Sequence, residues 1–384
     1  MNEGSFGVAA NAAGQHGREV KMKPYIVAVF NQKGGISKTT TSTNLAICLA
    51  AFGKSVVLVD LDSQGDSTKS LGIDPAVKKG IFDIFIGSAE IADVLIPTDF
   101  ANVSILPSTY SLAGIEIKLS ELKDSQRTMV AILGRGGLDC DYVIIDCPPA
   151  LGILPINALA AANAVIIPVT ATPYANDGLL RTLPSIKYVQ EGLNKGLLLQ
   201  GVLFTINDRN KTTRKINQLI RSRLGGTVYR TEIPRDTTVI EAASARLPVC
   251  AYAPRSPAAL AHLDFAEEFL DRHYKTVAKN GVQLAPLISR EQALEALTRW
   301  QSEHTARVAK PTGEGVRQRK DQLDRLLYGN RRGFERMHLN LIHFFIDNRM
   351  WLVAFVLVTL AASALLVLGG LSGIRMIATA VGLM

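Results

Sequence analysis

The sequence predicts an α/β fold whose sheet is mostly parallel and covered by helices on both faces. Short, nearly continuous apolar runs rich in β-branched residues alternate with helix-length amphipathic segments, which is the pattern of a doubly wound sheet. Hydrophobic residues make up 47% and charged residues 20% of the 384 positions. Most of the chain can therefore bury a core, which excludes global disorder.

The alternation of strands and helices begins at residue 25 and ends near residue 270. The predicted strands are 25–30, 55–60, 142–146, 164–169 and 199–207. The predicted helices are 39–52, 179–190, 212–224 and 257–270. Gly53 directly follows the first helix, at the position where glycine commonly ends one.

Composition divides the chain into five parts. We expect a disordered N-terminal extension over 1–22, a globular domain over 23–272, a charged and partly helical linker over 273–348, a transmembrane helix over 349–374 and a short tail over 375–384. The extension lacks the apolar region of a signal peptide. For the linker, a small helical domain is the alternative interpretation.

The predicted membrane span rests on an uncharged stretch over 350–374. As a helix it would be about 37 Å long, enough to cross a hydrocarbon core of about 30 Å. The residues Arg331, Arg332, Arg336 and Arg349 precede the stretch, and only Arg375 follows it. Because positive residues stay in the cytoplasm, the sequence predicts a C-terminal tail anchor at the inner (cytoplasmic) membrane, with the globular domain facing the cytoplasm.

The net charge of +8 is unevenly distributed. Residues 1–270 carry 26 basic and 25 acidic side chains, whereas 271–349 carry 15 and 9. Within the nearly neutral first part, a basic strip over 209–235 has Glu232 as its one acidic residue. Its basic members are Arg209, Lys211, Arg214, Lys215, Arg221, Arg223, Arg230 and Arg235. The four cysteines show no CxxC spacing, so neither a zinc site nor a redox motif is indicated.

The strongest local signal is Asn31–Thr41, NQKGGISKTTT, between the first predicted strand and helix. A tight glycine-containing loop at a helix N-terminus directs backbone N–H groups at one point, which favours phosphate binding. Lys38 would neutralise the β- and γ-phosphates, and the Thr39 hydroxyl would bind Mg²⁺. The pattern GxxxxGK[ST] itself is not met, because Gln32 and Ser37 occupy its glycine positions. The pattern that is met is KGGxxK[ST].

With three further motifs, this loop resembles the ParA/MinD family of deviant-Walker ATPases, and most closely the ParA-type partition ATPases. The resemblance covers roughly Lys23 to Arg272. The further motifs are VDLDSQGDST at Val59–Thr68, YVIIDCPPALG at Tyr142–Gly152, and the late pair Ile233-Pro234-Arg235 and Ala253-Pro254-Arg255-Ser256. The resemblance implies a P-loop NTPase fold and an ATPase that is slow, partner-stimulated and dependent on ATP and Mg²⁺.

Residue roles follow from the same resemblance. Lys33 resembles the signature lysine that reaches the partner's phosphates in an ATP-sandwich homodimer, Asp62 matches the position that orients the attacking water, and Lys38 completes the predicted catalytic set. The predicted nucleotide contacts are Gly34, Gly35, Ile36, Ser37, Lys38, Thr39, Thr40, Asn207 and Pro234, and the predicted metal ligands are Thr39 and Asp146. For Asp60 we favour a capping or switch-orienting role over a catalytic one.

The basic strip has three open interpretations. In the family, arginines at matching places face non-specific DNA, which implies DNA contacts by Arg209, Arg214 and Arg235. Such a strip would neutralise several phosphates and bind DNA in a salt-dependent way. An anionic lipid surface would attract the same charges, and a merely solvated basic helix is the third interpretation.

The predicted function is that of a membrane-anchored ParA-like ATPase that positions or segregates DNA or a DNA-processing complex, in partition or conjugative transfer. A DNA-binding adaptor or a secretion-channel protein would stimulate it. The alternative is a MinD-like organiser that recruits protein partners at the inner membrane without DNA. A further alternative is a nucleotide-binding scaffold with negligible turnover, because the Cβ of Ser37 stands where such loops keep glycine.

Overall fold

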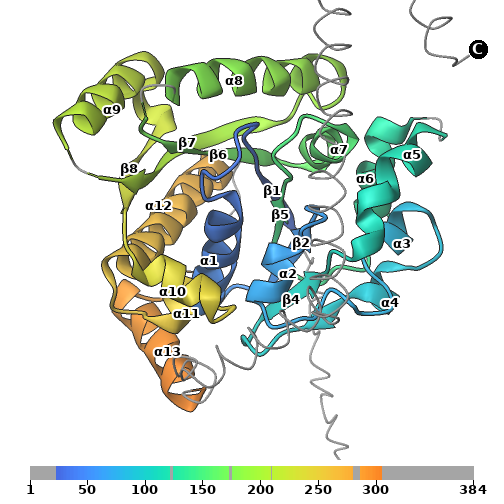
Figure 1. Cartoon of the computed structure of the whole chain (residues 1–384), viewed down its shortest axis with the longest axis horizontal. Helices are drawn as coiled ribbons and strands as arrows, with labels where there is room; N and C mark the ends of the chain where they lie inside the picture. Colours follow the sequence, from blue (N-terminus) through green and yellow to red (C-terminus); the bar gives the residue numbers. More distant parts are fainter. Residues whose placement is uncertain (1–22, 122–123, 173–174, 209, 280–285, 305–384) are drawn as a thin grey trace, which may run out of the picture. The chain divides into compact units, whose positions relative to one another are not determined.

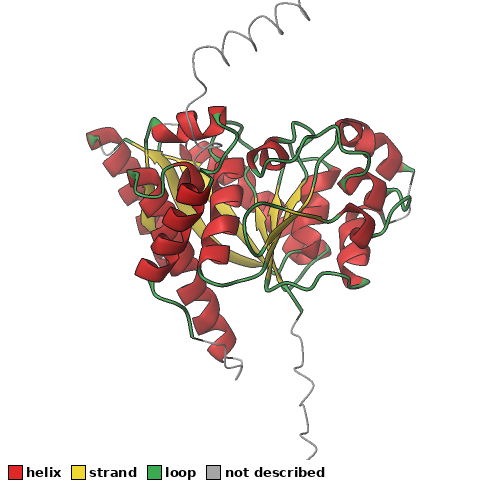
Figure 2. Ribbon diagram, turned by 90° about the horizontal axis from the view of Figure 1, so that it is seen from below, coloured by secondary structure: helices red, strands yellow, loops and turns green. Residues whose placement is uncertain are grey.

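The computed structural model describes residues 23–121, 124–172, 175–208, 210–279 and 286–304. They form an eight-stranded sheet in the order β3-β4-β2-β5-β1-β6-β7-β8, with helices on both faces (Figures 1 and 2). Every strand pair is parallel except β3 with β4. The mostly parallel α/β sheet is the one predicted from the sequence.

The strands agree closely with the predicted ones and add three. They are β1 (Tyr25–Val29), β2 (Val56–Asp60), β3 (Ile96–Pro97), β4 (Val103–Leu106), β5 (Tyr142–Asp146), β6 (Ala164–Thr170), β7 (Leu198–Asn207) and β8 (Val228–Pro234). The sequence analysis missed β3 and β8, which lie at the two edges of the sheet, and the short β4, which lies next to one edge between β3 and β2. Edge strands are shorter or more polar, so the buried apolar run that marks a central parallel strand is weak there.

Thirteen α-helices and three 3₁₀ turns are found in the described residues. The helices are α1 (Lys38–Ala51), α2 (Asp66–Ser70), α3 (Ile81–Phe85), α4 (Ile91–Val94), α5 (Ile115–Ser120), α6 (Thr128–Gly134), α7 (Ile153–Ala161), α8 (Ala175–Gly192), α9 (Lys211–Leu224), α10 (Thr238–Ser244), α11 (Val249–Tyr252), α12 (Pro257–Lys279) and α13 (Arg290–Glu303). The 3₁₀ turns are η1 (Tyr110–Gly114), η2 (Ser125–Arg127) and η3 (Gly225–Thr227).

Alternation along each strand divides the core between the two faces of the sheet. In β1, Val27 and Val29 face the core formed with α1, α11, α12 and α13, whereas Ala28 faces the core formed with α6, α7 and α8. Strands buried on both faces read as continuous apolar runs, because successive side chains point to opposite sides. This burial fixes the carboxyl ends of the central strands at one edge of the sheet, where the P-loop lies.

A helix from the predicted linker belongs to this fold. In α13, Ala293 and Leu297 are buried against the α1 and α12 side of the sheet. The Trp300 ring stacks on Phe100 with 4.3 Å between centroids, and its Nε1 donates to Asp99 O at 3.0 Å. The fold therefore continues past the predicted boundary at residue 272, and residues 305–348 of the linker lie outside the described residues.

The predicted location at the inner membrane is contradicted. Within the described ranges, no helix combines the length and the apolar character needed to cross a membrane. The longest one, α12, has 23 residues but carries charged side chains such as Asp264, Glu267 and Arg272. The segment 349–374, on which the prediction depended, lies outside the described residues, as do 1–22 and 375–384. No described element supports an anchor.

Candidate functional site

The loop between β1 and α1 adopts a compact turn around the helix N-terminus. Gly35 and Ser37 both have left-handed backbone conformations, with φ of 70° and 66°. α1 then begins at Lys38, with no acidic residue in its first turn and no side-chain cap among the described residues. The N–H groups of the first helical turn and the positive end of the helix dipole together favour an anion at this point. The geometry is that of a phosphate-binding loop.

Lys38 is held inside this loop. Its side chain is buried, and its Nζ donates to Lys33 O at 2.9 Å across the loop. Burial lowers the pKa of the Lys38 ammonium, while the nearby Asp146 carboxylate opposes that shift. An ammonium that must leave water gains from a multiply charged anionic ligand. Lys38 can therefore serve as the counter-charge for phosphate groups.

Lys33 lies at the entrance of the loop. Its Nζ donates to Thr172 Oγ1 at 3.4 Å, and its backbone N–H donates to Asn31 Oδ1 at 3.0 Å. Asn31 is in turn fixed by an amide hydrogen bond to Pro168 O at the end of β6. The side chain is half-buried, so its ammonium is folded against the protein in the single chain.

Asp146, at the carboxyl end of β5, is the centre of a cluster of hydroxyls. It is fully buried and accepts hydrogen bonds from Thr39 Oγ1 at 2.8 Å, Ser42 Oγ at 3.0 Å and Ser67 Oγ at 2.7 Å. Burial is the main cause that raises the pKa of Asp146, to about 6. Ser42 and Ser67 were not predicted, although hydroxyls in the loop helix and in the second motif were a signal that could have found them.

The donor set around Asp146 fits magnesium. Mg²⁺ takes oxygen ligands and usually keeps several waters, with one or two carboxylates from the protein and the rest from substrate phosphates. Thr39 and Asp146 supply one hydroxyl and one carboxylate within 2.8 Å of each other. In the described part of the chain no group of three or more His, Cys, Asp or Glu side chains could hold a metal. A magnesium site of this type does not need such a group, because water and the substrate's phosphates supply the other ligands.

Asp60, beside Asp146 in the β2–β5 register, organises the second motif. Its Oδ2 accepts from Thr68 N at 2.8 Å and Thr68 Oγ1 at 2.6 Å, and its Oδ1 accepts from Asp62 N at 3.1 Å. Burial and then the charge of Asp146 raise the pKa of Asp60. Asp62 lies in this turn, and its side chain is half-buried. Through these contacts Asp60 orients the segment from Asp62 to Thr68.

Asn207 and Pro234 lie on the opposite side of the loop from Asp146. They are register partners at the carboxyl ends of β7 and β8. Thr205, two residues earlier, donates from Oγ1 to Ile36 O at 3.1 Å and so ties β7 to the loop. Asn207 is buried, and its Nδ2 donates to the Glu232 carboxylate. The sequence analysis did not identify Glu232 as part of the site.

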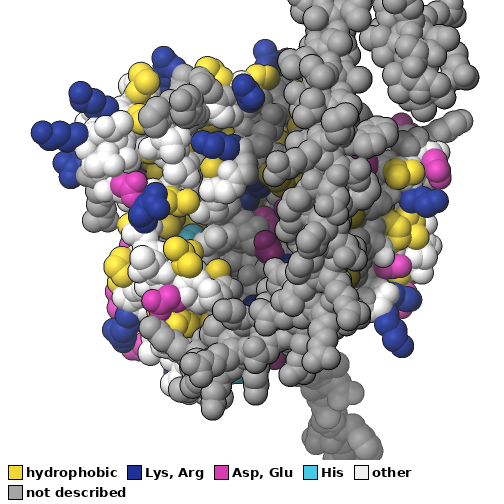
Figure 3. Space-filling model, viewed as in Figure 1, with side chains coloured by type: hydrophobic (Ala, Val, Ile, Leu, Met, Phe, Trp, Pro, Cys, Tyr) yellow, Lys and Arg dark blue, Asp and Glu magenta, His cyan; other side chains and the backbone are white. Residues whose placement is uncertain are grey.

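The basic strip does not act as one uniform surface. Arg214 is exposed on α9, and Lys and Arg side chains gather at the α9 corner of the face seen in Figure 3. Arg235 pairs with the carboxylate of Asp208. Arg221 is turned inward and donates to Glu232 at 2.9 Å, so it belongs to the fold rather than to a free cationic surface. Arg209 lies outside the described residues.

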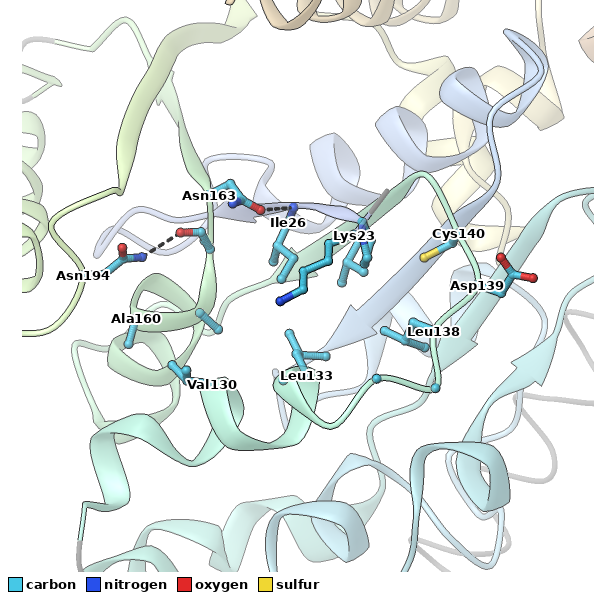
Figure 4. A pocket seen from close by; sticks show the side chains of 17 residues that line it. Lys23, Ile26, Val130, Leu133, Leu138, Asp139, Cys140, Ala160, Asn163 and Asn194 are labelled. Carbon is cyan, nitrogen blue, oxygen red and sulfur yellow. Dashed lines mark hydrogen bonds between the residues drawn. The ribbon is translucent and has the colours of Figure 1, made fainter. Parts of the chain in front are cut away.

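A separate cavity opens at the amino ends of β1 and β5. It has a volume of about 620 Å³ and is walled mainly by apolar side chains such as Ile26 and Leu133. Figure 4 shows the Lys23 side chain extending into it. Asn163, on its rim, accepts from Ile26 N at 2.8 Å. None of the predicted nucleotide-binding residues lines this cavity, and the phosphate-binding loop is at the other end of the strands.

The fold and the loop geometry define a P-loop nucleotide triphosphatase of the deviant-Walker type. A family model described as an AAA domain matches residues 24–199. The sporulation initiation inhibitor protein Soj of Bacillus subtilis is 42% identical over 245 residues, covering 63% of this chain and 97% of that protein. The chromosome partitioning protein ParA of Caulobacter vibrioides is 36% identical over 258 residues, covering 66% and 97%.

Solved structures agree with this assignment. The chain resembles a cobyrinic acid a,c-diamide synthase from Mycobacterium smegmatis, solved with bound ADP and magnesium, at 33% identity and a TM-score of 0.58, over 69% of this chain and 99% of that one. The same protein was also solved with an ATP analogue and magnesium. The chain therefore belongs to the ParA/MinD family of P-loop ATPases. The predicted cofactors, ATP and Mg²⁺, are confirmed.

Proposed function

We propose that this P-loop ATPase is a ParA-like partition protein, in which ATP drives dimer formation and DNA binding. The observation that carries the proposal is the single edge of the sheet at which Lys38, Thr39, Asp62 and Asp146 meet. Relatives that are named chromosome partitioning proteins support DNA as the cargo. Turnover is slow without an activating partner.

Each residue has a distinct part in phosphoryl transfer, which needs positioning and charge stabilisation more than covalent chemistry. The loop from Gly34 to Thr40 surrounds the phosphates, and Lys38 neutralises charge on them. Thr39 and Asp146 hold Mg²⁺, which neutralises charge on the phosphate oxygens when bound. Asp62 orients the attacking water. Asn207 and Pro234 contact the base.

Lys33 accounts for the proposed dimer. In the single chain its ammonium donates a hydrogen bond of 3.4 Å to a neutral hydroxyl, Thr172. A second subunit's triphosphate is a stronger partner for that ammonium than a hydroxyl is. Lys33 therefore crosses to the partner's phosphates, and the dimer depends on ATP.

The ATPase proposal is tested by measuring phosphate release from the full-length chain. Lys38→Ala should lower the rate by about 100-fold or more, since one preorganised charge contributes at least that much to transition-state stabilisation. Lys187→Ala is the matched control, because Lys187 is exposed on α8 and pairs only with Glu191 in the described contacts. Equal rates for wild type and Lys38→Ala would refute the ATPase proposal.

The partition proposal is tested by binding to duplex DNA of arbitrary sequence. With ATP and Mg²⁺, fluorescence anisotropy should report binding that weakens steeply with salt, whereas ADP should leave the binding weak. A chain that forms the ATP dimer but does not bind DNA at low salt would contradict the DNA part of the proposal. That outcome would leave the ATPase proposal standing, because phosphate release tests it separately.

A further inference from the structure

The cavity at the amino ends of β1 and β5 has the size of a small-molecule site. Its volume of about 620 Å³ lies within the range of about 300–1,000 Å³ that is usual for ligand pockets. Lys23 and Ile26 line it at the amino end of β1, whereas the phosphate-binding loop follows the carboxyl end of that strand. The nucleotide chemistry proposed above therefore does not account for this cavity.

The loop between α6 and β5 borders the cavity without filling it. Gly136 and Gly137 in this loop both have left-handed backbone conformations, with φ of 82° and 97°, which glycine adopts without steric cost. A Cβ placed on Gly136 would meet no heavy atom within 4 Å, apart from its neighbours in the chain. The space beside the loop is therefore open to a ligand.

Most of the remaining wall is apolar. Val143 is buried, and Leu133 and Leu138 are half-buried. Burial raises the pKa of the Cys140 thiol to about 12, so this side chain is uncharged at neutral pH and behaves as a small apolar group. A ligand with an apolar body would bury that body against this wall and gain from its removal from water.

Lys23 brings a positive charge to the apolar cavity. Its side chain extends into the cavity, away from Asp139 (Figure 4). Among the described residues, none forms an ion pair or a hydrogen bond with its ammonium. Asn163 adds a second donor on the rim, because its Oδ1 accepts from Ile26 N at 2.8 Å and its Nδ2 has no acceptor in the described contacts. An ammonium beside an apolar surface gains from an anionic partner.

We infer that this cavity binds a small amphiphilic carboxylate, whose apolar body fills the cavity and whose carboxylate pairs with Lys23. The inference goes beyond the proposed function and does not depend on it. A neutral apolar molecule would leave the ammonium without a partner, and a small inorganic anion would leave the apolar wall unfilled. A free medium-chain fatty acid has both of the required parts.

The test is the ratio of the dissociation constants for decanol and decanoate. Both would be measured by calorimetric titration of the full-length chain, below the concentration at which decanoate forms micelles. Wild type should bind decanoate more tightly than decanol. In Lys23→Met, which keeps an apolar stem and removes the charge, the ratio should fall by about tenfold, the effect of one hydrogen bond to a charged group. Lys23→Arg should retain most of the preference.

A second pair of variants tests the position of the carboxylate. Val130 lines the cavity from α6 and is 36% exposed, so a polar side chain is tolerated there. Val130→Asp should lower the ratio because its charge repels decanoate, whereas the neutral Val130→Asn should not. The affinity should also rise about fourfold for each methylene added from hexanoate to decanoate, if the chain lies in the cavity.

The matched control is Lys187→Met, because Lys187 is exposed on α8 and does not line the cavity. This variant loses the same charge as Lys23→Met and should keep the wild-type ratio. A ratio within a single preparation does not depend on the folded fraction, so loss of stability alone does not imitate the effect.

An unchanged ratio in Lys23→Met, or a wild type that binds decanoate no better than decanol, would overturn the inference. It would also be overturned if free decanoate did not bind while the chain sedimented with vesicles of phosphatidylglycerol and phosphatidylcholine in a way that depends on Lys23, since the anion would then be a membrane lipid. A lower ratio in Lys23→Met and in Val130→Asp, with the wild-type ratio in Lys187→Met, supports the assignment.

Discussion

The Thr39 hydroxyl at the start of α1 donates a hydrogen bond of 2.8 Å to Asp146 Oδ2 at the end of β5. These residues are far apart in sequence, and the contact brings together the two protein groups suited to a magnesium ion. Ser42 and Ser67 satisfy the same carboxylate, which keeps a buried acidic group hydrogen-bonded. The site is thus preorganised in the single chain.

We expect Asp62→Ala to lower the ATP hydrolysis rate by about 100-fold, because a residue that positions the reacting water contributes roughly this factor. The affinity for ATP should stay within about twofold, since Asp62 lies in the turn after β2 and not in the phosphate-binding loop. Single-turnover hydrolysis and equilibrium binding would separate the two effects. Asp66→Ala, which removes an exposed partner of Lys69, should retain the wild-type rate.

Ser37 occupies a left-handed conformation, with φ of 66° and ψ of 32°. A β-branched side chain is strained there, so Ser37→Val should reduce the free energy of unfolding by about 1–2 kcal/mol. Ser37→Gly should not destabilise the protein, because glycine adopts this conformation without steric cost. Chemical denaturation would measure both variants. Equal destabilisation by the two substitutions would show that the backbone strain at Ser37 is negligible.

Arg214 projects from the exposed face of α9, and Arg221 from its inner face. Arg214→Ala should weaken DNA binding and reduce the slope of log K against log salt by about 1, because one phosphate contact is lost. The folded stability should hardly change. Arg221→Ala should instead lower the melting temperature, since it leaves Glu232 without its ion-pair partner. Salt titrations combined with thermal melts distinguish the two arginines, and an unchanged slope for Arg214→Ala would exclude it from the DNA contact.

His262 should make the fold sensitive to acid. Its ring is fully buried in α12, neither nitrogen has a partner in the described structure, and burial lowers its pKa to about 3. In the unfolded chain His262 takes up a proton as the pH falls through about 6.5. In the folded chain it stays neutral until the pH approaches 3. Stability is therefore present above about pH 6.5 and falls as the pH drops towards 3, by up to about 1.4 kcal/mol per unit.

His262→Leu should remove this contribution, so that the free energy of unfolding falls less steeply between pH 6 and pH 4. Burial also lowers the pKa of His273, to about 4, so part of the slope should remain. His304→Leu, at a half-buried histidine at the end of α13, provides the comparison. Identical slopes in wild type and His262→Leu would contradict the prediction.

The sequence by itself determined those features that depend only on residues adjacent in the chain. The apolar runs of the central strands, the glycine-containing loop before α1 and the lysines within it are local features, so fold class, ATP and Mg²⁺ followed from them. Lys38 and Thr39 begin α1 and Asp146 ends β5, so all three lie at the carboxyl edge of the parallel sheet.

The tertiary structure alone decided which distant side chains meet at that edge. The strand order brings Ser67 to Asp146 and Glu232 to Asn207, and no local pattern encodes such contacts. It also turned Arg221 of the basic strip inward and packed α13 onto the core. Charge and hydrophobicity counted along a chain cannot resolve these cases, because the direction in which a side chain points is set by the packing of the elements around it.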